Sequence, residues 1–388
     1  EPRALQRSRL NSPLDKIRRT VRGKLMLDLS DDQSQAIDLI TKELKANQKA
    51  SLHGFAGTGK TTIARLIAAN FGSGHYLAYT GKAADVLRSK GGTGARTIHS
   101  AFYSLDGERA DGQPKFFTVA PVAGPFRRGL IVLDEASMVP KHTMDLILEH
   151  VDFWEDLHLL CIGDPFQLPP VNDDPHEFMS QPPTAMLSQI HRQAAGDPIL
   201  RLATQIRLGE KTDGDGITFA NANDIDDSIL ADVDIVLTGR NETRRHINHH
   251  VRKVKGYDGE TPAVGERVVC LRNNARVGVY NGSTYMVTDS TEVVNEDAVA
   301  LTVRDGEGQR YGVKCRSADF TGNAGKWEIG YDHFDFGHAI TVHKAQGSEF
   351  DRVVLANEPI GSSAELKRRW MYTGITRAKG QLTIMQMA

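Results

Sequence analysis

Residues Gly54 to Thr61 read Gly-Phe-Ala-Gly-Thr-Gly-Lys-Thr, which fits the pattern G-x-x-x-x-G-K-[ST] of a phosphate-binding loop. An apolar stretch, 50–52, enters this loop, and a helical pattern, 62–69, leaves it. In that context the glycines let backbone amides turn toward a β-phosphate, and the helix N-terminus adds partial positive charge. Lys60 would reach the β- and γ-oxygens, and Thr61 would ligate Mg²⁺. The segment therefore predicts a nucleotide and Mg²⁺ site on a strand–loop–helix unit.

Two further segments add phosphate chemistry. Residues 130–135 read Leu-Ile-Val-Leu-Asp-Glu, an apolar strand that ends in two carboxylates. Asp134 would hold Mg²⁺ through water, and Glu135 would polarise the attacking water as general base. Gln167 lies in the segment 163–170, where its side chain could donate to a γ-phosphate. A plain proline-rich turn explains that last segment equally well.

The pattern around these motifs indicates an α/β fold. Strand candidates alternate with helix candidates from 30 to 162, and the helix from 30 has Ser30 as its N-cap. A second such series begins after Pro198 and resumes from 338 to 385. This alternation predicts parallel sheets with crossover helices. Between the two parts of the second series, 256–335 is rich in β-like runs and hairpin turns, which predicts a small inserted β-barrel.

Composition sets limits on the class of protein. The 388 residues are 40% hydrophobic and 25% charged, as in a globular protein of two to three domains. No apolar run approaches the ~18 residues that cross a bilayer, so we expect no membrane partner. Cys161, Cys270 and Cys315 are widely spaced, which argues against disulfides or a zinc site and favours a reducing, cytoplasmic setting.

Charge is unevenly distributed although the net charge is only −2. Residues 1–28 carry eight Lys/Arg against three Asp/Glu, and residues 240–255 carry six against one. Such clusters can face nucleic-acid phosphates, or they can be solvated helix faces. Charge alone leaves both interpretations open.

In this order, the segments resemble a superfamily 1 helicase, and in particular the RecD/Dda-like branch of 5′-to-3′ DNA helicases. Residues 341–350, Thr-Val-His-Lys-Ala-Gln-Gly-Ser-Glu-Phe, are a close match to motif V. The resemblance covers the following segments: 29–36 (the adenine-reading segment), 54–61 (motif I), 79–84 (Ia), 97–100 (Ib), 134–137 (II), 163–170 (III), 187–192 (IV), 341–350 (V) and 372–379 (VI).

The resemblance implies roles around ATP and Mg²⁺. Gln33 would contact the adenine and Glu349 the ribose. Arg192 and Arg377 would meet the phosphate charge from the facing lobe. The phosphates and Mg²⁺ would be held by Gly54, Gly57, Thr58, Gly59, Lys60, Thr61, Thr62 and Asp134, with Glu135 and Gln167 completing the catalytic group.

It also implies contacts to single-stranded DNA. The residues that would line the strand are Thr80, Lys82, Thr97, His99, Thr341 and His343. Phe116 and Phe117 could form the apolar tip of a strand-separating pin, or they could be core aromatics of a small hairpin.

The architecture implied is two RecA-like lobes with insertions. Lobe 1 would span 29–190, with a small pin-like insertion at 104–129. Lobe 2 would comprise 191–255 and 336–388. An SH3-like β insertion, signalled by Val279-Tyr-Asn-Gly282, would occupy 256–335, and 1–28 would be a basic N-terminal arm.

We therefore expect a monomeric ATP-dependent DNA helicase that moves 5′-to-3′ on single-stranded DNA and opens duplex or fork DNA. Replication, recombination or repair proteins are possible partners. An RNA helicase or a translocase that does not separate strands is an alternative. A nucleotide-switched DNA-binding module is an alternative of another class.

Overall fold

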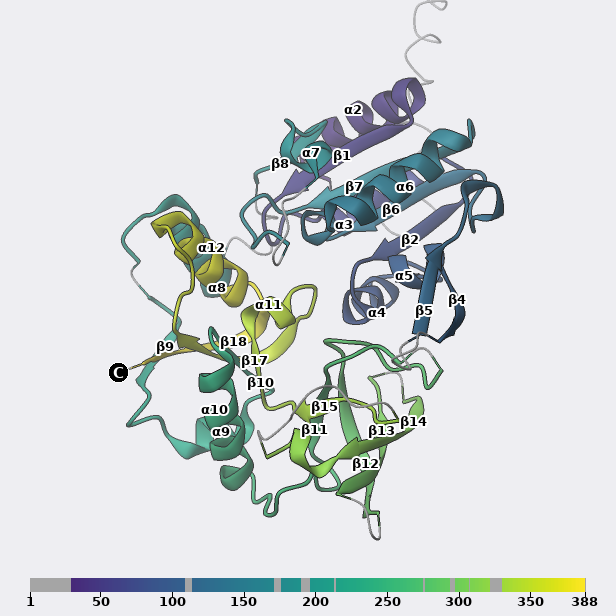
Figure 1. Ribbon diagram of the computed structural model, residues 1–388. Helices are drawn as coiled ribbons and strands as arrows, with labels where there is room; N and C mark the ends of the chain where they lie inside the picture. Colours follow the sequence, from purple (N-terminus) through teal and green to yellow (C-terminus); the bar gives the residue numbers. More distant parts are fainter. Residues whose placement is uncertain are drawn as a thin grey trace, which may run out of the picture.

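The computed structural model describes residues 29–108, 114–170, 176–189, 196–212, 214–274, 276–293, 297–306, 308–321 and 330–387, with the backbone alone at 105–108 and 114–117. These residues form three parts, as seen in Figure 1. A parallel sheet with its helices lies at the top, a second parallel sheet lies at the lower left, and an antiparallel sheet lies at the lower right. The predicted arm, 1–28, falls outside the described residues.

Lobe 1 is built on a parallel sheet whose strands are buried on both faces. Leu130, Ile131, Val132 and Leu133 are all fully buried, as expected for a central strand covered by helices on either side. In spatial order the strands are β3 (Arg96–Thr97), β2 (Gly74–Ala78), β6 (Gly129–Asp134), β7 (Leu157–Gly163), β1 (Lys49–Gly54) and β8 (Ala185–Leu187). The helices are α2 (Asp31–Asn47), α3 (Lys60–Ala68), α4 (Gly81–Ser89), α5 (Ile98–Phe102), α6 (Lys141–Phe153) and α7 (Glu177–Ser180), with short 3-10 turns η1 (Pro121–Ala123) and η2 (Ala136–Met138).

Helix α2 begins with a reciprocal cap. The Ser30 hydroxyl accepts the backbone N–H of Gln33, and the Gln33 side-chain oxygen accepts the N–H of Ser30 at 3.1 Å. This pair satisfies two amides that the first helical turn leaves without partners. It also fixes the Gln33 side chain against the start of the helix, next to the phosphate loop.

Lobe 2 has a second parallel sheet. Its core includes Trp370 and Tyr372, both almost fully buried. In spatial order the strands are β16 (Ala339–Thr341), β10 (Ile235–Thr238), β17 (Phe350–Asn357), β18 (Ala378–Gln386) and β9 (Thr218–Asn221). The helices are α8 (Pro198–Leu208), α9 (Asp227–Asp232), α10 (Asn241–Val254), α11 (Val342–Ala345) and α12 (Ala364–Ile375).

The third part is a five-stranded antiparallel sheet with its own apolar core. Its strands, in spatial order, are β14 (Arg310–Arg316), β13 (Ala298–Arg304), β12 (Thr284–Glu292), β11 (Arg267–Cys270) and β15 (Phe334–Phe336), and η4 (Ser317–Asp319) follows β14. A separate hairpin, β4 (Tyr103–Glu108) and β5 (Pro114–Thr118), extends from lobe 1. Both features fall where the sequence predicts insertions, and their SH3-like and pin-like character remains a prediction.

Buried ion pairs connect the antiparallel sheet to helix α10 of lobe 2. Arg252 of α10 binds Glu266 at 2.5 Å and lies over the Phe336 ring at 3.8 Å. Arg244 of the same helix binds Asp335 of β15 at 2.7 Å. Both side chains are buried: Arg252 is 3% exposed and Arg244 is 5% exposed. These two arginines of the basic cluster at 240–255 therefore neither bind phosphates nor lie on a solvated helix face, because each neutralises a buried carboxylate.

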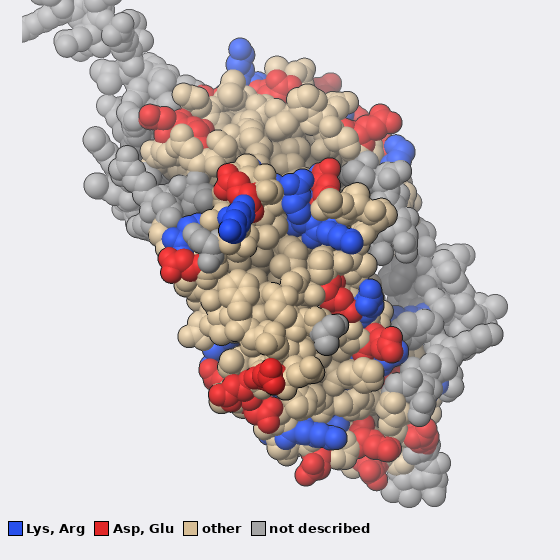
Figure 2. Space-filling model, turned by 90° about the vertical axis from the view of Figure 1, so that its left-hand side faces the viewer, with Lys and Arg blue, Asp and Glu red and all other residues tan. Residues whose placement is uncertain are grey.

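The surface agrees with the small net charge. Figure 2 shows one face on which Lys/Arg and Asp/Glu are interspersed around a broad area that carries neither. Within the described ranges, the chain contains no helix with the length and apolar character needed to span a bilayer. The predicted α/β class with parallel sheets is confirmed.

Candidate functional site

The phosphate loop joins β1 to α3 at the edge of lobe 1 where the parallel strands end. Gly57 and Gly59 have φ of 76° and 83°, left-handed values that favour glycine. A Cβ at Gly54 would lie 2.8 Å from the Thr58 hydroxyl, so this position also requires glycine. The Lys60 ammonium donates to the carbonyls of Gly54 and Phe55, at 2.7 and 2.9 Å. The loop thus curls around its own lysine, a cradle that suits phosphate oxygens.

The paired carboxylates stand directly opposite this loop. Asp134 ends β6, and its Oδ2 lies 3.5 Å from the hydroxyl of Thr61 in the first turn of α3. Two hard oxygen ligands at this position fit the partial protein shell that Mg²⁺ accepts. Burial raises the pKa of Asp134, and the neighbouring Glu135 amide and Lys60 charge act in the opposite direction.

Glu135 has an unusual backbone conformation. Its φ of 51° and ψ of 39° are left-handed, which is uncommon for a residue with a side chain and often marks a functional site. Burial raises the pKa of its carboxyl, while the positive charge of Arg377 from lobe 2 lowers it. A base of raised pKa, close to a lobe 2 cation, matches the role predicted for the carboxylate that activates water.

The loop after β7 connects this acidic site to lobe 2. Asp164 is fully buried, and its Oδ1 accepts the Phe166 amide at 3.0 Å. Gln167 is 5% exposed, and its Oε1 has no hydrogen-bond partner among the described residues. An unsatisfied buried amide oxygen in this loop is available for water or a bound ligand.

Helix α12 of lobe 2 packs against both loops. The Tyr372 hydroxyl accepts the Ala56 amide at 2.9 Å and donates to Asp164 at 2.7 Å. One residue on, the Thr373 hydroxyl accepts the Leu168 amide at 3.1 Å. Since Ala56 belongs to the phosphate loop and Asp164 to the next loop, one lobe 2 helix contacts both.

Arg377 follows α12 and is 4% exposed. Its guanidinium donates to the carbonyls of Thr373 and Ser348, at 3.1 and 3.3 Å, and to the Thr376 hydroxyl at 3.2 Å. These bonds all stay within lobe 2. They hold the positive charge at the lobe interface, where it acts on Glu135.

The other residues predicted to bind nucleotide contact the loop or a neighbouring helix. Gln33 donates to the Thr58 carbonyl at 3.1 Å, and the Thr58 hydroxyl donates to Phe55. Thr62 is half-buried in the first turn of α3. Glu349 binds Lys90 of lobe 1 at 2.6 Å, an ion pair between lobes that the sequence does not predict. The adenine and ribose roles of Gln33 and Glu349 remain predictions.

Three threonines predicted to meet DNA share one structural role. Thr80, Thr97 and Thr341 are the N-caps of α4, α5 and α11, and each hydroxyl oxygen accepts an amide of the following turn. A capping oxygen that accepts still carries a proton it can donate, and helix N-termini favour anions. The arrangement is therefore compatible with phosphate contacts from both lobes.

The two histidines predicted to meet DNA are held among other groups. His99 stacks on Tyr103, with ring centroids 5.0 Å apart, and lies 5.9 Å from the Tyr79 ring. Burial lowers the pKa of His99, and His142 lowers it further; burial also lowers the pKa of His343. Both rings are therefore neutral near pH 7 and can offer hydrogen bonds or stacking to a strand, but no charge.

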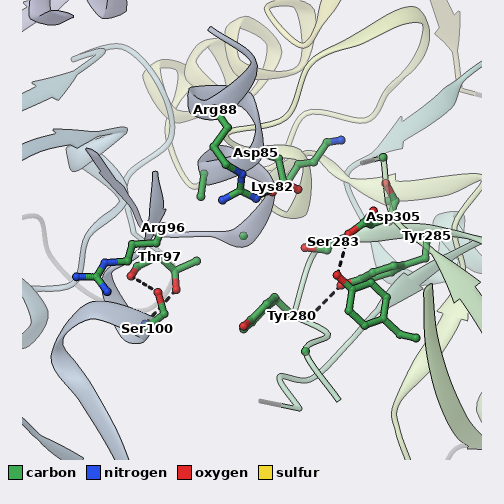
Figure 3. Close-up of a pocket in the computed structure, with 16 residues that line it drawn as sticks. Lys82, Asp85, Arg88, Arg96, Thr97, Ser100, Tyr280, Ser283, Tyr285 and Asp305 are labelled. Atoms are coloured by element: carbon green, nitrogen blue, oxygen red, sulfur yellow. Dashed lines mark hydrogen bonds and ion pairs between the residues drawn. The ribbon is translucent and has the colours of Figure 1, made fainter. Parts of the chain in front are cut away.

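A pocket of about 160 Å³ lies between α4 and the antiparallel sheet. Figure 3 shows Lys82 and Arg96 on the lobe 1 side, opposite Tyr280. Lys82 and Thr97 are predicted DNA residues; Arg96 and Tyr280, which line the same pocket, are not among the residues that the sequence predicts for the site. Sequence gives little signal for those two, because the pocket forms only when segments almost 200 positions apart meet.

Some predicted site residues cannot be placed. Arg192 falls outside the described residues. Phe116 and Phe117 lie on β5, where they face Leu105 and Ser104 of β4 in the strand register, and their side chains are not described. The choice between a pin tip and hairpin core therefore stays open.

Comparison with known proteins identifies the family. Residues 28–225 match a family model described as an AAA domain, and residues 336–385 match a UvrD-like helicase C-terminal domain. Over 387 aligned residues the chain is 30% identical to the ATP-dependent RecD2 DNA helicase of Deinococcus radiodurans. The alignment covers 90% of this chain and 48% of that protein. It is 27% identical to the RecBCD enzyme subunit RecD of Mycolicibacterium smegmatis, over 86% of this chain and 67% of that one.

Solved structures agree in fold. A Pif1 helicase from Bacteroides in complex with ADP-AlF3 and ssDNA has a TM-score of 0.58 and 19% identity, over 93% of this chain and 92% of that chain. The chain spans about half the length of the RecD2 relative. From the match over 28–225, this chain belongs to the AAA domain family, and its C-terminal segment and the RecD relatives make it similar to superfamily 1 helicases of the RecD kind.

Proposed function

We propose that the chain hydrolyses ATP to move 5′-to-3′ along single-stranded DNA and to separate duplex DNA ahead of it. The observation that carries this proposal is the pairing of a base and a cation from facing lobes. Glu135 directly follows β6 of lobe 1, and the charge of Arg377 in lobe 2 acts on its carboxyl. Such a site is complete only when both lobes meet, which couples chemistry to lobe movement. The names of the RecD2 and Pif1 relatives support the same activity.

In this proposal the two lobes divide the work on the nucleotide. Lys60 and the loop amides would bind the phosphates, and Thr61 with Asp134 would hold Mg²⁺, which neutralises phosphate charge when bound. Glu135 would orient and deprotonate water. Gln167, and Arg192 with Arg377 from lobe 2, would meet the charge that develops on the γ-phosphoryl group.

Movement of the lobes would follow from a difference in ATP affinity between their closed and open arrangements. ATP held between the lobes favours the closed arrangement, and loss of the γ-phosphate removes that preference. The residues that would bind DNA come from both lobes: Thr80, Lys82, Thr97 and His99 from lobe 1, and Thr341 and His343 from lobe 2. Because each lobe would hold the backbone in turn, closing becomes a step along the strand. Contacts of this kind predict little sequence preference and strong dependence on salt.

Several finer points belong to the same proposal. The domain limits are 29–190, 191–255 with 336–388, and 256–335, the last being SH3-like. The hairpin within 104–129 would act as the pin, and 1–28 as a basic arm. We also propose a cytoplasmic monomer that works with replication, recombination or repair proteins, and the widely spaced buried cysteines are consistent with a reducing compartment.

The test compares substrates that differ only in the tail. ATP turnover is measured with and without single-stranded DNA, and strand separation is measured on forked duplexes with a 5′ or a 3′ tail. We expect DNA to raise turnover strongly and the 5′-tailed duplex to open. Stimulation by RNA alone would support an RNA helicase, and stimulation without opening would support a translocase. ATP turnover that nucleic acid does not change would contradict the proposal and would support a nucleotide-switched binding module instead.

A further inference from the structure

The Tyr372 side chain joins three segments that lie far apart in the sequence. Its hydroxyl accepts the Ala56 amide of the phosphate loop at 2.9 Å and donates to Asp164 after β7 at 2.7 Å. The ring is 1% exposed and meets Phe166 edge-on, with centroids 5.4 Å apart. A single hydroxyl that both accepts and donates uses its full bonding capacity here. The tyrosine therefore cannot rotate away without breaking two bonds between the lobes.

The rest of α12 reinforces this junction. Arg369, one turn earlier, donates to the Pro165 carbonyl at 2.9 Å. Thr373 accepts the Leu168 amide, and Gln346 of the neighbouring segment donates to the Leu168 carbonyl at 3.0 Å. The loop from Asp164 to Leu168 is thus bonded along one face of a lobe 2 helix. Arg377 follows the end of this helix, and its Nε donates to the Thr373 carbonyl.

We propose that Tyr372 is a positioning residue that ties the closing of the lobes to the conformation of the phosphate loop, and thereby sets Arg377 at the γ-phosphate. This inference rests on the proposed ATP hydrolysis and adds a residue to which neither the sequence motifs nor the relatives assign a role. The hydroxyl touches no reacting atom. It acts through Ala56 on the loop that binds phosphates, and through α12 on the arginine.

The chemistry of the hydroxyl suits this role. Burial raises the pKa of Tyr372, and the neighbouring Asp164 carboxylate raises it further. The phenol therefore keeps its proton at physiological pH and remains a donor to Asp164. Phenylalanine has the same ring and removes the oxygen alone, so the Tyr372→Phe variant keeps the packing against Phe166.

The test separates positioning from nucleotide binding. Affinities for ADP and for ADP with aluminium fluoride, a mimic of the transferred phosphoryl group, are measured with single-stranded DNA present. Y372F is expected to lower affinity for the aluminium fluoride complex about tenfold or more, as for a lost hydrogen bond to a charged group. Affinity for ADP alone should change by less than about twofold, and kcat should fall while KM for ATP stays nearly constant.

Two controls make the outcome decisive. Tyr257→Phe removes a hydroxyl that donates to the Gly265 carbonyl, outside the site, and should leave both affinities unchanged. Asp164→Asn removes the charge from the same junction and should reproduce the Y372F selectivity, so a misfolded Y372F still leaves a test. If Y372F and D164N weaken ADP and its aluminium fluoride complex equally, or weaken neither, the positioning role is refuted. Wild-type protein that hydrolyses no ATP would instead refute the proposed function itself.

Discussion

Replacing Arg377 by alanine tests the division of the active site between lobes. An arginine that meets the transferred phosphoryl group contributes about 10³-fold or more to kcat, which is about 4 kcal/mol of transition-state stabilisation. Because charge at the γ-phosphoryl group is largest in the transition state, ATP binding in the ground state should change little. We therefore expect Arg377→Ala to lower kcat about a thousandfold and to change KM for ATP by less than about threefold.

The structure also predicts that this variant folds. The Thr373 carbonyl keeps the Thr376 hydroxyl as a second donor at 3.1 Å, so the main structural loss is the bond to the Ser348 carbonyl. One buried acceptor left unsatisfied costs about 1–3 kcal/mol of unfolding free energy. A loss of that size lowers the melting temperature by several degrees without unfolding the protein.

Steady-state ATP turnover with saturating single-stranded DNA, together with thermal unfolding, measures both effects. Arg352→Ala is the matched control, because Arg352 is half-exposed and its ion pairs, with Asp232 and Asp234, lie within lobe 2. Its turnover should equal that of the wild type. If Arg377→Ala raises KM and leaves kcat unchanged, the arginine serves ground-state binding, and our assignment of its role is wrong.

Three further perturbations test other parts of the site. Lys60→Ala should abolish turnover and keep part of the DNA affinity, measured by filter binding; strand separation by this variant would refute the loop assignment. Glu349→Gln should raise KM for ATP if the carboxylate meets the ribose, whereas an equal effect of Lys90→Met would show that the ion pair between lobes matters instead. Burial alone would raise the pKa of Glu266, but bonds from His338, Arg252 and a backbone amide hold it below 4.5. The ionised Glu266 carboxylate therefore stabilises the folded protein fully above about pH 4.5, and this stabilisation is lost as the pH falls through the lower folded-state pKa. In a profile of unfolding free energy against pH, Glu266→Gln should weaken the dependence at acid pH and cost about 3–5 kcal/mol at pH 7.

The sequence predicts those parts of the molecule whose residues are contiguous in the chain. The phosphate loop is one short segment whose glycines, lysine and threonine carry their own backbone requirements, and the structure gives Gly57 and Gly59 the positive φ that such a loop needs. The central strands were equally clear, because a strand buried on both faces is a continuous apolar run. Short edge strands such as β8, with three residues, carry no such pattern.

What the sequence could not supply are contacts between distant segments. The Lys90–Glu349 pair, the Tyr372 junction and the pocket between α4 and Tyr280 each join residues about 200 or more positions apart. The reciprocal cap of Ser30 and Gln33 is local and fits a sequence pattern, whereas the left-handed backbone of Glu135 is uncommon for a residue with a side chain and is not expected from its residue type. The pairing of Arg244 and Arg252 with buried carboxylates was missed for the same reason: charge counts along a helix do not distinguish an inner from an outer face.

Those two arginine pairs have a mechanical consequence. They link the antiparallel sheet to α10, so we expect the sheet and lobe 2 to move together. The pocket beside Lys82 has one wall on that body and the other on lobe 1. If the lobes move as proposed, the width of this pocket would change with the bound nucleotide, although the pocket lies away from the phosphate loop.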